Sequence, residues 1–160
     1  GNLARFTSKL ADVVRIPEPV RADLSLNELV RSVDALTRIE CRKRNISLSL
    51  SLADPDTIIR ADGIQLEQVL VNIVKNAYEA IGHDGRIRIV TTADPPSVTV
   101  EDNGPGIPEE IRKQLFTPFF TTKPSGQGIG LMFVREVLNN HRMAFSLTSQ
   151  NGCTRFENSV

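Results

Sequence analysis

The sequence lacks three features that would assign it to a specialised class of proteins. Its 19 basic and 19 acidic residues cancel, so no overall field favours nucleic acid or an anionic membrane surface. No apolar run approaches the roughly 18 residues that span a bilayer, and no secretory signal peptide is recognisable. The two cysteines, Cys41 and Cys153, lie far apart without metal-binding spacing, so we expect reduced thiols and a cytoplasmic location. The sequence leaves open whether a longer protein containing this stretch is anchored in a membrane.

The length of the chain predicts one domain, preceded by a short segment of another. At 160 residues it can enclose a substantial core. Apolar side chains within residues 2–16 recur at helical spacing, and Pro17-Glu18-Pro19 stops that helix. We interpret residues 1–19 as the end of an upstream helical hairpin with its linker, and residues 20–160 as the domain proper. The alternative is that this first helix packs on the surface of the domain itself.

The rest of the chain alternates helical and strand patterns. Helices are predicted from Leu26 to about Arg44, capped by Ser25 or Asp23, from Asp62 to Ile81, closed by Gly82, and from Ile129 to Asn140, with a short helical turn after Pro108. Strands are predicted over residues 46–52, 57–60, 86–92, 97–101, 144–148 and 154–157, the last two as a hairpin around Asn151-Gly152. The first helix is expected to bury Leu26, Leu29, Val30, Val33, Leu36 and Ile39. This order of elements predicts an α/β two-layer sandwich.

Two glycine-rich segments bracket an aromatic, threonine-rich loop. The first reads Asp102-Asn-Gly-Pro-Gly-Ile107, and the second reads Gly126-Gln-Gly-Ile-Gly-Leu131, directly before the last helix. Glycine lets backbone amides approach a ligand, and a helix N-terminus favours an anion, so the second segment is a candidate phosphate cradle. It matches neither a Walker A loop nor the dinucleotide-binding fingerprint. The simpler alternative is a pair of turns and caps without a ligand.

Polar side chains are aligned on the longest predicted helix. Gln68, Asn72 and Asn76 lie four residues apart, with Glu79 beside them. Asparagine has a low helix propensity, so two of them at this spacing suggest a function, although a solvated helix face is the simpler explanation. A carboxamide oxygen, together with phosphate oxygens and water, suits Mg²⁺. At the end of a predicted strand, Asp102 can accept a hydrogen bond from an exocyclic amine such as that of adenine, or simply cap a turn.

In this order and at this spacing, the motifs resemble the Bergerat-fold ATP-binding domain of sensor histidine kinases. Asn72-x-x-x-Asn76-Ala resembles the N box, Asp102-x-Gly-x-Gly106 the G1 box, residues 116–120 the F box, and Gly126-x-Gly128-x-Gly130 the G2 box. The run Pro118-Phe-Phe-Thr-Thr-Lys123 is most similar to the nitrogen-regulation type of sensor. The resemblance covers about residues 26–156. It implies a mixed sheet backed by three helices, with ATP between the long helix and a lid over about residues 104–127.

The resemblance also implies a role for each matching residue. Asn76 is implied as the Mg²⁺ ligand and Asp102 as the residue that reads adenine. Asn72, at the phosphate end, and Lys123, in the lid, are the implied catalytic residues and would also contact ATP. Further contacts to ATP are implied for Gly104, Gly106, Ile107, Thr122, Gly126, Gly128, Ile129, Gly130 and Leu131.

Position 72 favours one activity over another. In relatives that hydrolyse ATP, such as DNA gyrase and MutL, a glutamate four residues before the Mg²⁺ asparagine activates water, whereas Asn72 cannot accept a proton at neutral pH. The resemblance therefore implies transfer of the γ-phosphoryl group to a histidine, a nucleophile that needs positioning more than a base. The alternatives are a Bergerat-fold ATPase and a nucleotide-binding module without transfer activity. A serine-directed anti-sigma kinase fits the N-terminal helix less well.

The implied partners are an upstream dimerisation domain that carries the phosphoacceptor and a cognate response regulator. A homodimer is implied for the longer protein, and a monomer is expected for this fragment, with no role for nucleic acid. Neither His83 nor His141 has the sequence context of a phosphoacceptor, and we expect His141 to end the last helix. His141-Arg142-Met143 stands where the family usually has His-Gly-Gly, and Cys153-Thr-Arg-Phe156 where it has Gly-Thr-x-Phe. These departures leave the geometry of the final hairpin open.

Overall fold

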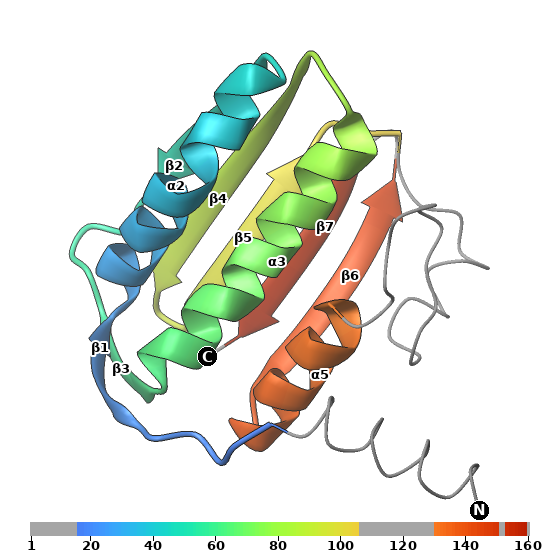
Figure 1. Ribbon diagram of the computed structural model, residues 1–160. Helices are drawn as coiled ribbons and strands as arrows, with labels where there is room; N and C mark the ends of the chain where they lie inside the picture. The colour runs from blue at the N-terminus through green and yellow to red at the C-terminus, as the bar shows by residue number, and fades with distance from the viewer. Residues whose placement is uncertain (1–15, 106–129, 151–152, 160) are drawn as a thin grey trace, which may run out of the picture.

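A mixed sheet of five strands carries three helices on one face (Figure 1). The computed structural model describes residues 16–105, 130–150 and 153–159. Its helices are α2 (Leu26–Lys43), α3 (Gly63–Ile81) and α5 (Gly130–Asn140). The strands of the sheet are β2 (Ile46–Ser51), β4 (Gly85–Ala93), β5 (Pro96–Asp102), β6 (Ala144–Gln150) and β7 (Cys153–Ser159). The predicted two-layer α/β architecture is confirmed.

The order of strands across the sheet differs from their order in the sequence. The spatial order is β2-β4-β5-β7-β6, in which β2 pairs with β4 in parallel and all other neighbours are antiparallel. A parallel pair needs a crossover, and the segment that contains α3 supplies it. The last strand in sequence, β7, lies between β5 and β6, so the hairpin expected around residues 151–152 places its second strand inside the sheet.

A small ribbon beside the main sheet was not predicted in full. β1 (Ala22–Ser25) pairs antiparallel with β3 (Ile58–Ala61), with Ala22 opposite Ala61 and Ser25 opposite Ile58. The sequence predicted only the second of these strands. β1 is four residues long and pairs with residues far along the chain, so no local pattern marks it.

The start of α2 follows the prediction. The hydroxyl oxygen of Ser25 accepts a hydrogen bond from the backbone N–H of Glu28 at 3.1 Å, which satisfies one of the free amides of the first turn. The carboxylate of Glu28 accepts from Arg31 at 2.6 Å. Ser25 is therefore the cap, and Asp23 lies within β1.

The buried side of α2 differs from the predicted one. Leu36 and Ile39 are 61% and 66% exposed, so the prediction that they belong to the core was wrong. Leu26, Leu29, Val30 and Val33 are buried as predicted, and Thr37 and Cys41 are buried as well. Val33, Thr37 and Cys41 are spaced by four, which keeps them on one side of a helix with 3.6 residues per turn. Thr37 tolerates burial because its hydroxyl donates to the carbonyl of Val33 at 2.8 Å.

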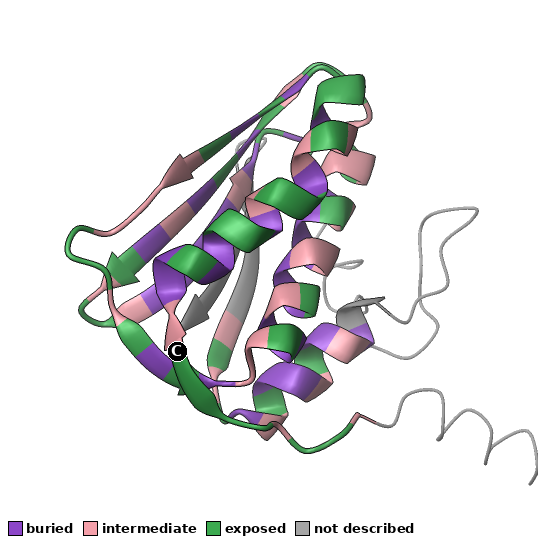
Figure 2. Ribbon diagram, turned by 60° about the vertical axis from the view of Figure 1, so that its left-hand side comes forward, coloured by how far each residue is buried: buried purple, intermediate pink, exposed green. Residues whose placement is uncertain are grey.

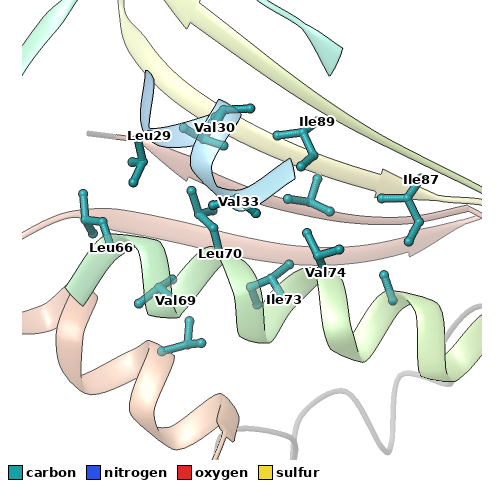
Figure 3. Packing of buried hydrophobic residues seen from close by; sticks show 14 of the residues in the cluster. Leu29, Val30, Val33, Leu66, Val69, Leu70, Ile73, Val74, Ile87 and Ile89 are labelled. Carbon is teal, nitrogen blue, oxygen red and sulfur yellow. The ribbon is translucent and has the colours of Figure 1, made fainter. Parts of the chain in front are cut away.

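The long helix α3 begins and ends at the predicted residues. The carboxylate of Asp62 accepts from the backbone N–H of Gln65 at 3.1 Å, and Gly82 ends the helix with φ of +78°, a conformation that glycine adopts without strain. Figure 3 shows the inner side of α3 packed against α2 and the sheet. The residues labelled there are Leu29, Val30, Val33, Leu66, Val69, Leu70, Ile73, Val74, Ile87 and Ile89. In Figure 2, the buried residues of the helices lie on the sides that face the sheet, and the exposed residues lie on the opposite sides.

The end of α5 is tied to the start of α3 through a histidine. His141 is buried; its Nε2 accepts from the backbone N–H of Asp62 at 3.0 Å, and its Nδ1 lies 2.9 Å from the carbonyl of Val137. Nδ1 therefore carries the proton and donates to Val137. This structural position matches the expectation that His141 ends the helix. Arg142 follows with φ of +59°, so an arginine adopts the left-handed conformation where the family usually has glycine.

The linker before the domain lies against the same helix start. The side-chain amide of Gln65 donates to the carbonyl of Pro17 at 2.9 Å, and the N–H of Val20 donates to Asp62 Oδ2 at 3.0 Å. The helix predicted over residues 2–16 falls almost entirely outside the described residues, so the proposed boundary between an upstream hairpin and this domain remains a prediction. Within the part of the chain that the structure describes, no helix is long and apolar enough to cross a membrane.

Candidate functional site

A buried carboxylate ends β5. Asp102 is 7% exposed, and it faces Ile87 of β4 in the strand register. Its Oδ1 accepts a hydrogen bond from the backbone N–H of Gly104 at 2.8 Å. Burial raises the pKa of the Asp102 carboxyl above its ordinary value, and the Gly104 hydrogen bond opposes that shift in part. An ordinary turn-capping aspartate is exposed, so the burial of Asp102 favours recognition of a ligand over simple capping.

The end of β5 packs tightly against the last turn of α3. A Cβ at Gly104 would lie 2.9 Å from Asp102 Oδ1 and 3.3 Å from Ile81 Cγ1. A Cβ at Gly85, the first residue of β4, would lie 2.5 Å from Ile81 Cγ2. Both glycines therefore leave room for the side chain of Ile81. Sequence reasoning identified Ile81 as the last residue of the long helix and gave Gly85 no role, because this contact depends on how the helix end meets two strands.

The predicted row of polar side chains lies along the outer part of α3. Asn72, Asn76 and Glu79 are partly buried, whereas Gln68 is exposed. The ammonium group of Lys75 lies 3.9 Å from the Glu79 carboxylate. The two asparagines thus lie at the border between core and solvent, where a neutral oxygen can share a hydrated cation with other ligands. Gln68 is exposed to solvent, as the alternative of a solvated helix face predicts.

The N-terminus of α5 faces the middle of α3. The two helices are in contact, and the hydrogen bond between Asp62 and His141 places the beginning of α3 beside the end of α5 (Figure 1). Both helices rise about 1.5 Å per residue and α5 is the shorter, so its start lies part of the way along α3. The first amides of a helix have no partner within that helix, and they attract anions. The helix begins at Gly130, where the sequence predicted it to begin within one residue.

Several predicted site residues cannot be placed. The residues that lie outside the described part of the chain are Gly106, Ile107, Thr122, Lys123, Gly126, Gly128 and Ile129. Gly130 and Leu131 are placed as the first residues of α5. The structure therefore places Asn72 and Asn76 on α3 and Gly104 beside its last turn, next to Asp102, and the roles of all the predicted site residues remain predictions.

Comparison with known proteins identifies the family. Residues 61–159 match the family model described as histidine kinase-, DNA gyrase B-, and HSP90-like ATPase. The chain therefore belongs to this family of ATPases. Within the family, it corresponds to the catalytic domain of sensor histidine kinases.

Individual relatives agree with this assignment. Sporulation kinase A of Bacillus subtilis is 34% identical over 148 residues, which cover 89% of this chain and 24% of the relative. The sensor histidine kinase ZraS of Escherichia coli is 33% identical over 152 residues, covering 94% of this chain and 33% of the relative. The chain thus spans about a quarter to a third of the length of these relatives. Neither name refers to nitrogen regulation, and the narrower resemblance to nitrogen-regulation sensors stays a prediction.

Solved structures show the same fold. The catalytic domain of histidine kinase ThkA superposes with a TM-score of 0.80 at 34% identity, over 88% of this chain and 94% of that chain. ThkA in complex with the response regulator protein TrrA superposes with a TM-score of 0.79 at 28% identity, over 99% of this chain and 48% of that chain. The expected mixed sheet backed by three helices is therefore confirmed.

Proposed function

We propose that this domain binds Mg-ATP and transfers the γ-phosphoryl group to a histidine on an adjoining domain of a sensor kinase. One observation carries the proposal: the buried carboxylate of Asp102 lies at the last turn of α3, and α5 packs against the same helix with its end held at the start of α3. Asp102, which would recognise the base, and the N-terminus of α5, which would bind phosphate, thus lie at different positions along α3, with Asn76 between them. A nucleoside triphosphate presents its base and phosphates in the same order.

Asp102 would select adenine. The amide of Gly104 occupies Oδ1, which leaves Oδ2 to accept a hydrogen bond from the exocyclic amine of adenine. Guanine presents a carbonyl oxygen at that position, so two acceptors would face each other in a desolvated site. A buried acceptor without its donor costs roughly 1–3 kcal/mol, which is enough for a clear preference for ATP over GTP.

Asn76 fits the role of an Mg²⁺ ligand. Its carboxamide lies at the solvent border, it supplies a neutral oxygen, and Mg²⁺ retains several waters and phosphate oxygens in such sites. When bound, the ion would neutralise phosphate charge and orient the phosphate chain. Asn72 would contact the phosphate end, and the amides at the start of α5 would bind phosphate oxygens. Lys123 and the lid glycines would complete the site, as the resemblance implies.

The side chain at position 72 favours transfer over hydrolysis. Asn72 has no basic group that could activate water, and it stands where hydrolysing relatives carry glutamate. An imidazole nucleophile requires no such base, so alignment in the active complex is sufficient. We propose that the longer protein dimerises and passes the phosphoryl group on to a response regulator, the kind of partner named in the ThkA–TrrA complex.

Calorimetric titration with a non-hydrolysable ATP analogue, with and without Mg²⁺, tests the proposal. We expect binding that Mg²⁺ strengthens in the wild-type chain, and loss of that strengthening in Asn76→Ala. Asp102→Asn should weaken ATP and reduce its preference over GTP, whereas Asp94→Asn, an exposed aspartate in the turn before β5, should bind like wild type. An Asp102→Asn protein with unchanged selectivity would show that Asp102 is only a turn residue.

A further inference from the structure

The turn after α2 is fastened to the turn after α3. Nη1 of Arg44 donates to the carbonyls of Tyr78 and Gly82, each at 3.4 Å, and the guanidinium lies 4.8 Å from the centre of the Tyr78 ring. The N–H of Asp84 donates in turn to the carbonyl of Arg44 at 3.0 Å. The side chain that follows α2 thus contacts both a face of α3 and the carbonyls at its C-terminal end.

The orientation of Arg44 is itself fixed. Its Nε donates to Oε1 of Glu40, one turn earlier in α2, at 3.0 Å, and its side chain is 26% exposed. The side-chain amide of Asn45 donates to Oδ1 of Asp84 at 2.6 Å, which adds a second link between the same two turns. A partly buried guanidinium held by a carboxylate loses little further freedom when it binds the carbonyls, so its planar group can hold the helix end in place.

The segment that Arg44 fastens leads directly to the candidate adenine site. Ile81 lies between the two carbonyls that Arg44 binds, and its side chain fills the space left by Gly85 and Gly104. The amide of Gly104 donates to Asp102. A shift of the last turn of α3 would therefore move Ile81 against Gly104, and with it the carboxylate that reads the base.

We propose that Arg44 is a positioning residue for adenine recognition, acting through the last turn of α3 on Gly104 and Asp102. It directly follows α2, outside the residues that match the family model and outside the four motif boxes. The inference rests on the proposed function, because it requires that Asp102 reads the base. The competing explanation is that Arg44 only stabilises the fold.

A pair of matched arginine variants separates the two explanations. Arg38 lies in α2, pairs with Asp34 four residues earlier as Arg44 pairs with Glu40, and donates to the carbonyl of Leu48 at 3.4 Å. Arg38 therefore makes similar interactions away from Ile81. Arg44→Met and Arg38→Met each remove the charge and retain most of the apolar stem, and thermal unfolding measures the stability that each loses.

Calorimetric titration of ATP and GTP analogues then gives the decisive comparison. We expect Arg44→Met to weaken the ATP analogue roughly threefold to tenfold, and to lower the ratio of ATP to GTP affinity, on the scale of one lost hydrogen bond. Arg38→Met should keep the wild-type ratio at a comparable loss of stability. If Arg44→Met fails to fold, Arg44→Lys takes its place, since the lysine keeps the charge but lacks the planar group whose Nε binds Glu40 while Nη1 binds the carbonyls.

The outcomes are distinguishable from failure of the proposed function. Wild-type protein that binds neither nucleotide would overturn the proposed function and this inference together. Wild-type binding with an unchanged ATP-to-GTP ratio in the folded Arg44 variants would overturn the positioning role alone. An equal fall of that ratio in the Arg38 and Arg44 variants would do the same, because it would trace the effect to lost stability.

Discussion

Replacing Gly104 by alanine tests the packing at the end of β5. The backbone of Gly104 does not lie in the left-handed region, so alanine is not excluded by its conformation. The obstacle is the methyl group, which would approach Asp102 Oδ1 to 2.9 Å and Ile81 Cγ1 to 3.3 Å. The first distance is shorter than ordinary contact between carbon and oxygen, so either the carboxylate or the chain must move.

The expected magnitude follows from overpacking. An extra methyl group in a well-packed region costs about 1–3 kcal/mol, and a chain of this length loses about 2–4 °C of melting temperature per kcal/mol. We therefore expect Gly104→Ala to melt roughly 2–12 °C below wild type. Displacement of Asp102 should also weaken the ATP analogue by about tenfold, which corresponds to about 1.4 kcal/mol of binding free energy.

Calorimetry and thermal unfolding on the same samples measure both effects. Gly63→Ala is the matched control, because its methyl group would meet only the flexible Leu24 side chain, at 3.2 Å, and alanine favours the helix. That variant should be as stable as wild type or more so, with unchanged affinity. Gly104→Ala with wild-type affinity and melting temperature would refute the tight contact among Gly104, Ile81 and Asp102.

Two further predictions concern the core and the ionisation of the site. Leu29→Ala should cost about 2–5 kcal/mol of unfolding free energy, whereas Leu36→Ala, on the exposed side of α2, should cost less than about 0.5 kcal/mol; equal losses in chemical denaturation would contradict the burial of α2 described above. Because burial raises the pKa of Asp102, its ionised form, which accepts from adenine, is lost on acidification at a higher pH than for an ordinary aspartate. Above that pKa, burial of the charged carboxylate lowers the stability of the folded state, and this stability is regained as the pH falls through the pKa. Adenosine, which has no phosphate to titrate, should therefore bind more weakly to wild type at mildly acidic pH. Asp102→Asn should show no such dependence, and a flat profile in wild type would argue against a carboxylate reader.

Much of the fold could be predicted from the sequence because the interactions that set the ends of its helices act between neighbouring residues. Ser25 and Asp62 cap helices through hydrogen bonds that span three residues, and Gly82 ends a helix through its own backbone conformation. Strands with alternating apolar and polar residues were found for the same reason. These signals act within a few positions, so the helix ends and strands can be located before any tertiary contact is considered.

What could not be predicted depends on residues that are distant in sequence. The ribbon between β1 and β3 pairs Ala22 with Ala61, and neither segment carries a pattern strong enough to reveal the partner. Leu36 and Ile39 lie to one side of the buried stripe of α2, and apolar periodicity does not show how much of a wide apolar stripe other elements cover. A buried Thr37, satisfied by a carbonyl one turn earlier, takes the place that an apolar residue was expected to fill.

The candidate site shows the same division. Residue types and spacing were sufficient to predict Asn72, Asn76 and Asp102 as site residues. The burial of Asp102 could not be predicted, because it depends on how the end of β5 packs against the end of α3. Arg44 gave no motif signal; its four-residue spacing from Glu40 is common on helix surfaces, and only the neighbouring turn gives it a distinct role.

The position of β7 has a consequence for how the domain is made. β5, which ends in Asp102, has β4 on one side and β7 on the other, and β7 is the last strand of this sheet to leave the ribosome. Until then, β5 keeps one edge unpaired over the registers from Ser97 to Asp102, and an unpaired edge is open to association with other chains. The strand β5, which carries the Asp102 carboxylate, thus gains β7 as its second neighbour only when nearly the whole domain has been synthesised. A nascent chain released before Cys153 would contain all the motifs of the nucleotide site. It would lack β7, the strand that pairs with β5 beside Asp102.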